Sequence, residues 1–168
     1  KTTSKSPRST VGTITEIYDF LRLLFARAAD AYSYNTGEKM VSYSDEQIKE
    51  LIKEDYNGKK INVLAPVIKS RKGHYRELFE QIGKQGFVKV RVDGEIRDIV
   101  KGMKVDRYKT HDIEIVIDRL KIADSEELDK RLTETINTAM YSGDNVLMVL
   151  EEGQAEARYF SRDLMCPT

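Results

Sequence analysis

Apolar residues recur every three or four positions in four segments of the chain, which is the period of an amphipathic helix. Three of these segments open with the spacing of a helix N-cap, as in Ser44-x-x-Gln47. The fourth is short and ends at Gly86, a residue that tolerates the positive φ of a helix C-terminus. We therefore predict helices from Thr13 to Ala29, Ser44 to Asn57, Tyr75 to Gly86 and Asp124 to Ser142.

Other segments alternate apolar and polar residues, which is the period of a strand with one buried face. Residues 88–92 alternate valine with a basic residue, and Asp93-Gly94 supplies the positive-φ pair of a tight hairpin. Pro66 lacks a ladder donor and so favours a sheet edge or a strand end for the first strand. We predict strands over residues 61–68, 88–92, 95–99, 112–117, 145–150 and 157–160.

Several strands joined by hairpins, with few helices, predict an α+β fold. We expect a mainly antiparallel sheet with helices packed on one face. Residues 1–10 are polar, show no apolar period and are expected to form a loop or frayed end. The composition changes after the first helix, and we place a boundary near Tyr32.

The composition is that of a soluble globular protein of about one domain. The chain has 168 residues, of which 40% are hydrophobic and 33% charged. No stretch approaches the roughly 20 apolar residues of a membrane span, and no secretory signal is visible. The one cysteine, Cys166, cannot form an internal disulfide, which fits a reducing compartment, so we expect a cytoplasmic protein.

The charge is balanced overall, with 28 basic and 28 acidic residues, but it is unevenly distributed. Residues 59–111 carry 14 basic and 6 acidic groups, whereas residues 112–168 carry 6 and 13. A basic block beside an acidic one could steer a charged partner, or the two could neutralise each other on a solvated surface.

Catalytic chemistry has little support in the sequence. No Gly-x-x-x-x-Gly-Lys-Ser/Thr loop is present, and the cysteine and two histidines are 37 or more residues apart. We therefore expect neither a catalytic residue nor a bound cofactor or metal. One alternative is a metal hydrolase built on Asp112, Glu114 and Asp118, which share strand parity, although half-buried strands commonly present such residues to solvent.

The predicted hairpin carries the clearest candidate binding surface. Lys89 and Arg91 share the face opposite the valines, and Arg97 on the partner strand could extend it. Such a surface can bind carboxylates or phosphates. Nucleic-acid binders add stacking aromatics, and only Phe87 and Tyr108 lie nearby, so a protein partner and nucleic acid remain equal alternatives. The alternation also predicts that reversing the charge of Arg91 leaves the fold intact.

Five blocks along the chain, in the same order, resemble the UvrA family of the UvrABC excinuclease. They are RSTVGTITEIYDFLRLLFAR at 8–27, LAPVI and RKG at 64–73, KQGFVKVRVDGE at 84–95, HDIEIVIDR at 111–119, and FS with CP near the end.

The resemblance implies part of a nucleotide excision repair protein, a dimeric ABC-type ATPase that finds DNA lesions and loads its partner UvrB. Residues 1–32 would belong to a neighbouring signature domain, residues 33–153 to the UvrB-binding domain, and residues 154–168 to the return into the signature domain. The Walker motifs are absent, so we expect no enzyme activity from this chain, and ATP and zinc belong to the full-length protein. The implied partner is UvrB, with DNA bound through a homodimeric full-length protein, no membrane, and a monomeric isolated chain.

The resemblance also implies which residues meet UvrB. Lys89, Arg91 and Arg119 are the first candidates, followed by a second set comprising Arg97, Arg71 and Lys72. Two positions depart from the family: Lys89 stands where many relatives have arginine, and the Cys-Pro pair after the first helix is missing. The alternative function is a nucleic-acid-binding module that uses the basic segment 59–111 directly.

Overall fold

The structure is a computed structural model that describes residues 41–163. Residues Ser42–Asp163 form one compact unit. The first predicted helix, the boundary near Tyr32 and Cys166 lie outside the described residues. Within the described range, no helix has the length and apolar character needed to cross a membrane.

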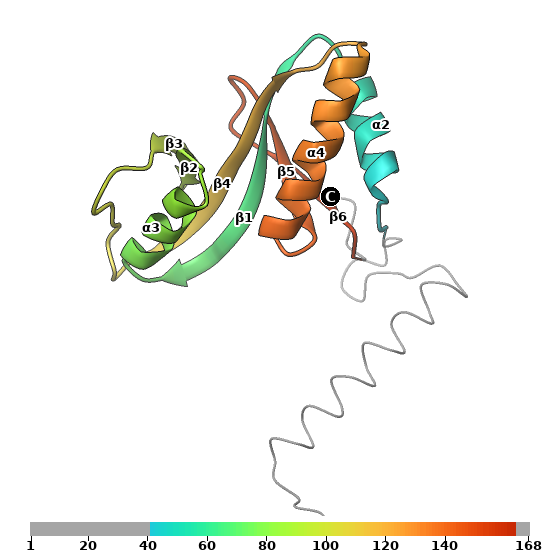
Figure 1. Cartoon of the computed structure of the whole chain (residues 1–168). Helices are drawn as coiled ribbons and strands as arrows, with labels where there is room; N and C mark the ends of the chain where they lie inside the picture. Colours follow the sequence, from blue (N-terminus) through green and yellow to red (C-terminus); the bar gives the residue numbers. More distant parts are fainter. Residues whose placement is uncertain (1–40, 164–168) are drawn as a thin grey trace, which may run out of the picture. The chain divides into compact units, whose positions relative to one another are not determined.

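The unit contains a six-stranded antiparallel sheet with the strand order β3-β2-β4-β1-β5-β6. Figure 1 shows the long β1 and β4 strands side by side through its centre, with α3 near one end of this pair and α2 and α4 near the other. These elements confirm the predicted α+β class. The strands are β1 (Lys60–Lys72), β2 (Lys89–Val92), β3 (Glu95–Asp98), β4 (Thr110–Lys121), β5 (Val146–Glu151) and β6 (Arg158–Ser161). The helices are α2 (Asp45–Asp55), α3 (Arg76–Lys84) and α4 (Glu126–Ser142).

The sheet continues beyond Gly153, because β6 pairs with β5. A domain division between residues 153 and 154 would therefore separate two strands of the same compact unit.

Strand β1 is central to the sheet, although it contains Pro66. Its pairing with β5 covers Ile61 to Leu64 only, so Pro66 faces a single neighbouring strand, β4. The β1–β4 register also shifts between Pro66 and Ile68. The missing N–H is tolerated because this part of a central strand is locally an edge.

All three helices pack on one face of the sheet, as predicted. Ile61 and Val63 are fully buried against α2 and α4, and Ala65, which points the same way from β1, is buried in a second cluster with α3. Ile117 packs against both clusters. Full burial of an aliphatic side chain of this kind stabilises the fold by about 1.5–3 kcal/mol.

The β2–β3 hairpin has the predicted two-residue turn. Asp93 and Gly94 both have positive φ, at 50° and 86°, which matches the twist of the flanking strands. Val90 and Val92 are buried as expected, but the prediction for Val88 is wrong, since its side chain is 69% exposed. Val88 precedes the first residue of β2, and its carbonyl accepts a hydrogen bond from Ile99 N at 2.8 Å.

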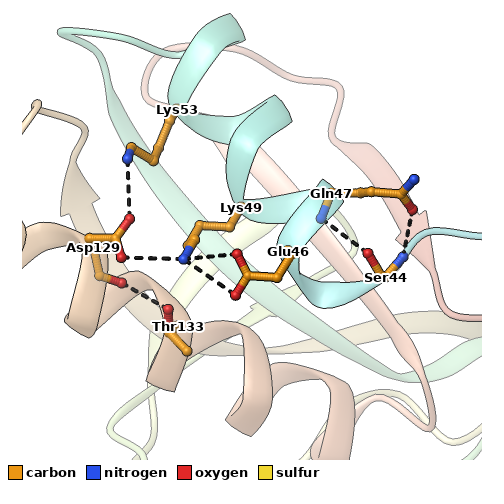
Figure 2. Close-up of polar contacts among 7 residues, drawn as sticks. All are labelled: Ser44, Glu46, Gln47, Lys49, Lys53, Asp129 and Thr133. Atoms are coloured by element: carbon orange, nitrogen blue, oxygen red, sulfur yellow. Dashed lines mark hydrogen bonds and ion pairs between the residues drawn. The ribbon is translucent and has the colours of Figure 1, made fainter.

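Helices α2 and α4 are joined by an ion-pair network, drawn in Figure 2. Lys49 and Lys53 of α2 each place Nζ close to the Asp129 carboxylate of α4, at 3.2 and 3.1 Å. Hydrogen bonds from Lys53 and then Lys49 lower the pKa of Asp129. At its start, α2 has the predicted capping box, in which Ser44 and Gln47 each accept a hydrogen bond from the other's backbone N–H.

The N-cap of α4 is Ser125, one residue after the predicted Asp124. The Ser125 hydroxyl accepts a hydrogen bond from the backbone N–H of Leu128 at 3.2 Å. This bond satisfies one of the N–H groups that the first turn of a helix leaves without a partner.

We predict that Ser125→Ala lowers the free energy of unfolding by about 1 kcal/mol, because it removes this cap. Asp124→Ala is the matched control and should cost less than about 0.5 kcal/mol, as is usual for exposed residues. Urea denaturation of the two variants measures both values. A larger loss for Asp124→Ala would assign the cap to that residue instead.

Candidate docking groove

The face of the sheet without helices carries a small apolar cluster. Leu64, Met148 and Leu150 are buried there, with Val116 and Ala157 packed against them. These residues alternate with the helix-facing ones along their strands, so they belong to the opposite face. No helix covers this cluster in the described unit.

Beside the cluster lies a groove of about 610 Å³, between the β2–β3 hairpin and the turn that follows β5. Apolar side chains line it together with two basic residues and four acidic ones, Glu95, Asp118, Glu151 and Glu152. The lining includes Lys89, Ile96, Val116, Arg119, Leu150 and Glu152. Two of the three first-choice residues from the sequence are thus brought together in one groove.

The two basic residues in the groove are partly exposed, and each forms one exposed ion pair. Lys89 lies opposite Asp98 in the hairpin, with its Nζ 3.6 Å from the carboxylate. Arg119 lies opposite Asn62 on the helix-free face and forms an ion pair with Glu152. Exposed pairs of this kind contribute little to stability, so both cations can change partners.

Arg91 shares the face of Lys89, as predicted, but it is not a free surface cation. Only 8% of the residue is exposed. Its Nη1 donates to Glu114 Oε1 at 2.9 Å, and its Nη2 donates to the Ala155 carbonyl at 2.8 Å. The expected direct contact to a partner is therefore corrected: Arg91 ties β2 to β4 and to the β5–β6 turn.

The carboxylate beneath Arg91 is also buried, with Glu114 5% exposed. Burial raises the pKa of Glu114, and the Arg91 guanidinium opposes this shift without cancelling it. Arg91 Nε and Glu114 Oε2 have no hydrogen-bond partner among the described residues. A buried pair of this kind is costly to break from either side.

The second-choice residues lie outside the groove. Arg97 pairs with Val90 across the hairpin, which puts it on the helix side, where its Nη2 is 3.2 Å from Glu95. The expectation that Arg97 extends the face of Lys89 is therefore wrong. Arg71 and Lys72 are exposed at the far end of β1.

The three acidic residues of β4 do not form a metal site. A β-bulge interrupts the alternation of side chains along β4, so Asp118 faces α4. There its carboxylate accepts hydrogen bonds from Arg131 Nη2 at 2.7 Å and from the Thr135 hydroxyl at 2.9 Å. Burial alone would raise the pKa of Asp118, but these hydrogen bonds hold it below its usual value. Glu114 instead pairs with Arg91 on the other face. Within residues 41–163, no three His, Cys, Asp or Glu side chains gather to hold a metal.

His111 is a buried clamp on the turn of the β2–β3 hairpin. Its Nδ1 lies 2.6 Å from Asp93 Oδ2, and its Nε2 lies 2.6 Å from the Asp106 carbonyl. The Asp93 carboxylate, followed by the Asp106 carbonyl, raises the pKa of His111. From the sequence, this histidine could be weighed only as a metal ligand.

Four further groove residues were not predicted from the sequence: Ile96, Val116, Leu150 and Glu152. The apolar three resemble ordinary strand residues in the sequence. Glu152 could have been considered from the sequence, because it lies between the last two predicted strands, residues 145–150 and 157–160.

A family model described as the UvrA interaction domain matches residues 44–153, a range that contains all six groove residues named above. The chain belongs to the UvrA family. It is 44% identical over 168 residues to UvrABC system protein A of Methanothermobacter thermautotrophicus, covering 99% of this chain and 18% of the relative. The same protein of Aquifex aeolicus is 41% identical over 167 residues, with the same coverages. That of Bacillus subtilis is also 41% identical over 167 residues and is covered to 17%. The chain thus spans less than a fifth of the length of these UvrA relatives.

We predict that Arg91→Met destabilises this UvrA interaction domain by about 3–5 kcal/mol, because Glu114 is left as an uncompensated buried charge. The double variant Arg91→Met, Glu114→Leu should recover most of that loss. Denaturant unfolding of both variants measures the difference, with Arg97→Met as the exposed control. Equal stability of Arg91→Met and the parent would contradict the burial of the pair.

We predict that the His111 clamp makes stability depend on pH above neutrality. Because the folded pKa lies above the ordinary value of 6.5, the contribution is full below that pH and is lost as pH rises through the folded pKa. His111→Asn should therefore flatten the fall in unfolding free energy as pH rises above about 6.5. His74→Asn makes the same substitution at the other histidine, outside the clamp, and serves as the control. An unchanged slope in His111→Asn would rule out the clamp.

Proposed function

We propose that this chain is the UvrB-docking part of a UvrA-like nucleotide excision repair ATPase, acting in the cytoplasm, and that the groove receives UvrB. The observation that supports this most is the convergence of Lys89 and Arg119 on one apolar-floored groove. Interfaces combine an apolar centre with a polar rim in the same way. The family description, an interaction domain, supports a protein partner.

Lys89 and Arg119 are the two cations in a lining that also carries four acidic residues, and an acidic contact segment on UvrB would meet these two cations. The Arg119 guanidinium can hold a carboxylate through two parallel hydrogen bonds, whereas the Lys89 ammonium acts as a point charge. The exposed side chain of Val88, which also lines the groove, extends the apolar area toward the β2–β3 hairpin. A stable interface buries about 800 Å² per partner, so we expect UvrB to cover the rims as well as the floor.

In this proposal the nucleotide chemistry belongs to the rest of the full-length protein. The 168 residues contain no phosphate-binding loop. The described residues offer no ligand set for zinc either, so no step of docking is assigned to a metal. ATP, zinc, dimerisation and DNA enter through the full-length protein.

A second candidate function, direct binding of nucleic acid, rests on the basic end of the β1–β4 pair. The ladder places the end of β1 opposite the start of β4, so the cations of both strands gather there. Tyr108, 75% exposed, lies in the same region and could stack on a base. The exposed cations in this region that take part in no ion pair among residues 41–163 are Lys69, Arg71, Lys72, Arg107 and Lys109.

We predict that Lys89→Glu and Arg119→Glu each weaken UvrB binding by about 1–2 kcal/mol, roughly five- to thirty-fold in Kd. Arg97→Glu makes the same charge change on the other face and should leave Kd within about twofold. The measurement is a calorimetric titration of the 168-residue chain with purified UvrB in the absence of ATP, with thermal melts to verify folding.

The same series separates the two functions. Salt-dependent binding of duplex DNA that is lost in Arg71→Glu and Lys72→Glu, with UvrB binding intact in all variants, would favour the nucleic-acid module. If Lys89→Glu and Arg119→Glu bind UvrB as the parent does, the groove is not the docking surface.

A further inference from the structure

Two basic residues of the helix-free face, Arg119 in the groove and the buried Arg91 outside its lining, are already held by the chain itself. The last residue of β5 and the turn that follows it carry three glutamates, and we call residues 151–156 the acidic turn. Glu152 of this turn forms the ion pair with Arg119, and the Ala155 carbonyl accepts from Arg91 Nη2 at 2.8 Å. The turn therefore presents a carboxylate and a carbonyl to the cations of the sheet face.

The acidic turn is exposed, although its backbone is attached to the sheet. Residues 152–156 are all exposed, and Gly153 has a φ of 86° with no atom near the position of a Cβ. A backbone hydrogen bond from Gln154 N to Glu151 O at 3.0 Å closes the turn, and Glu152 N donates to the Lys60 carbonyl of β1 at 2.9 Å, so only the side chain of Glu152 is free to change partner. The ion pair of Glu152 with Arg119 is exposed on both sides, and such pairs are weak and exchange readily with other partners.

We propose that the acidic turn occupies Arg119 in place of the partner, so that docking exchanges the Glu152 carboxylate for a carboxylate of the bound protein. This inference rests on the proposed docking function of the groove. Glu152 acts as an internal competitor: the affinity for a partner is reduced by the fraction of chains in which Arg119 is occupied. The partner carboxylate prevails because the closed interface removes water from its pair with the guanidinium.

The exchange also predicts the kind of partner that the groove selects. An acidic segment can replace Glu152, whereas a neutral or basic segment would leave both Arg119 and the displaced carboxylate without compensation. The acidic turn therefore favours a partner that presents a carboxylate near Arg119 over one that offers apolar contacts alone.

The test is removal of the competing charge, measured by calorimetric titration of the 168-residue chain with UvrB. Glu152→Gln should bind two- to five-fold more tightly than the parent at low salt, with a smaller gain at high salt. Glu156→Gln is the matched control, because it makes the same change in the same turn on a residue with no ion pair in the described unit. It should change Kd by less than about 1.5-fold.

A double-mutant cycle then isolates the pair. In the Arg119→Gln background, Glu152→Gln should no longer tighten binding, because the residue it masked is gone. The proposal is overturned if Glu152→Gln binds as the parent or more weakly, if Glu156→Gln gains as much, or if the gain persists in the Arg119→Gln background. If Arg119→Gln loses UvrB binding while Glu152→Gln binds as the parent does, the proposed competition is rejected and the docking groove is kept. If both variants bind as the parent does, the docking groove is rejected as well.

Discussion

The unit depends above all on the antiparallel pairing of β1 with β4. This ladder supplies the floor of the helix-side core and the floor of the groove, and it is interrupted by a bulge where Val63 pairs with Asp118 but Leu64 pairs with Val116. Because side chains alternate along a strand, the extra residue reverses which face each later side chain takes. The bulge is the reason that Asp118 points to α4 while Arg119 points into the groove.

The β2–β3 hairpin shows how much of the structure can be predicted from local sequence patterns. Alternation and the Asp93-Gly94 turn predicted a hairpin with Val90 buried, and both are present. A two-residue turn also fixes the register, so the position of Arg97 opposite Val90 could have been predicted from the turn alone. Burial of Arg91 could not, because the carbonyl that covers it belongs to Ala155, 64 residues further along the chain.

The groove also combines residues that local sequence patterns identify with a shape that depends on long-range strand pairing. Lys89 was named from the alternation of the hairpin and from a resemblance of motifs, and Arg119 from the resemblance alone; both identify residues but give no shape. The groove itself exists because two hairpins rise on either side of the β1–β4 floor, and the order of strands that places them there is set by long-range pairing. The same limit explains the missed bulge, since a single extra residue in a strand leaves no periodic signal in a sequence of isoleucines and acids.

The uneven distribution of charge along the sequence is explained in part by ion pairs between the basic and acidic segments. Part of the basic block is neutralised by the acidic block across the sheet, as in the pairs of Arg91 with Glu114 and of Lys59 with Glu151. The buried pair is fixed, because separating it would leave a charge without solvent. Pairs at the groove edge are solvated and can be exchanged at little cost. Burial, more than the sign of the charge, therefore decides which basic residues hold the sheet together and which remain available to a partner.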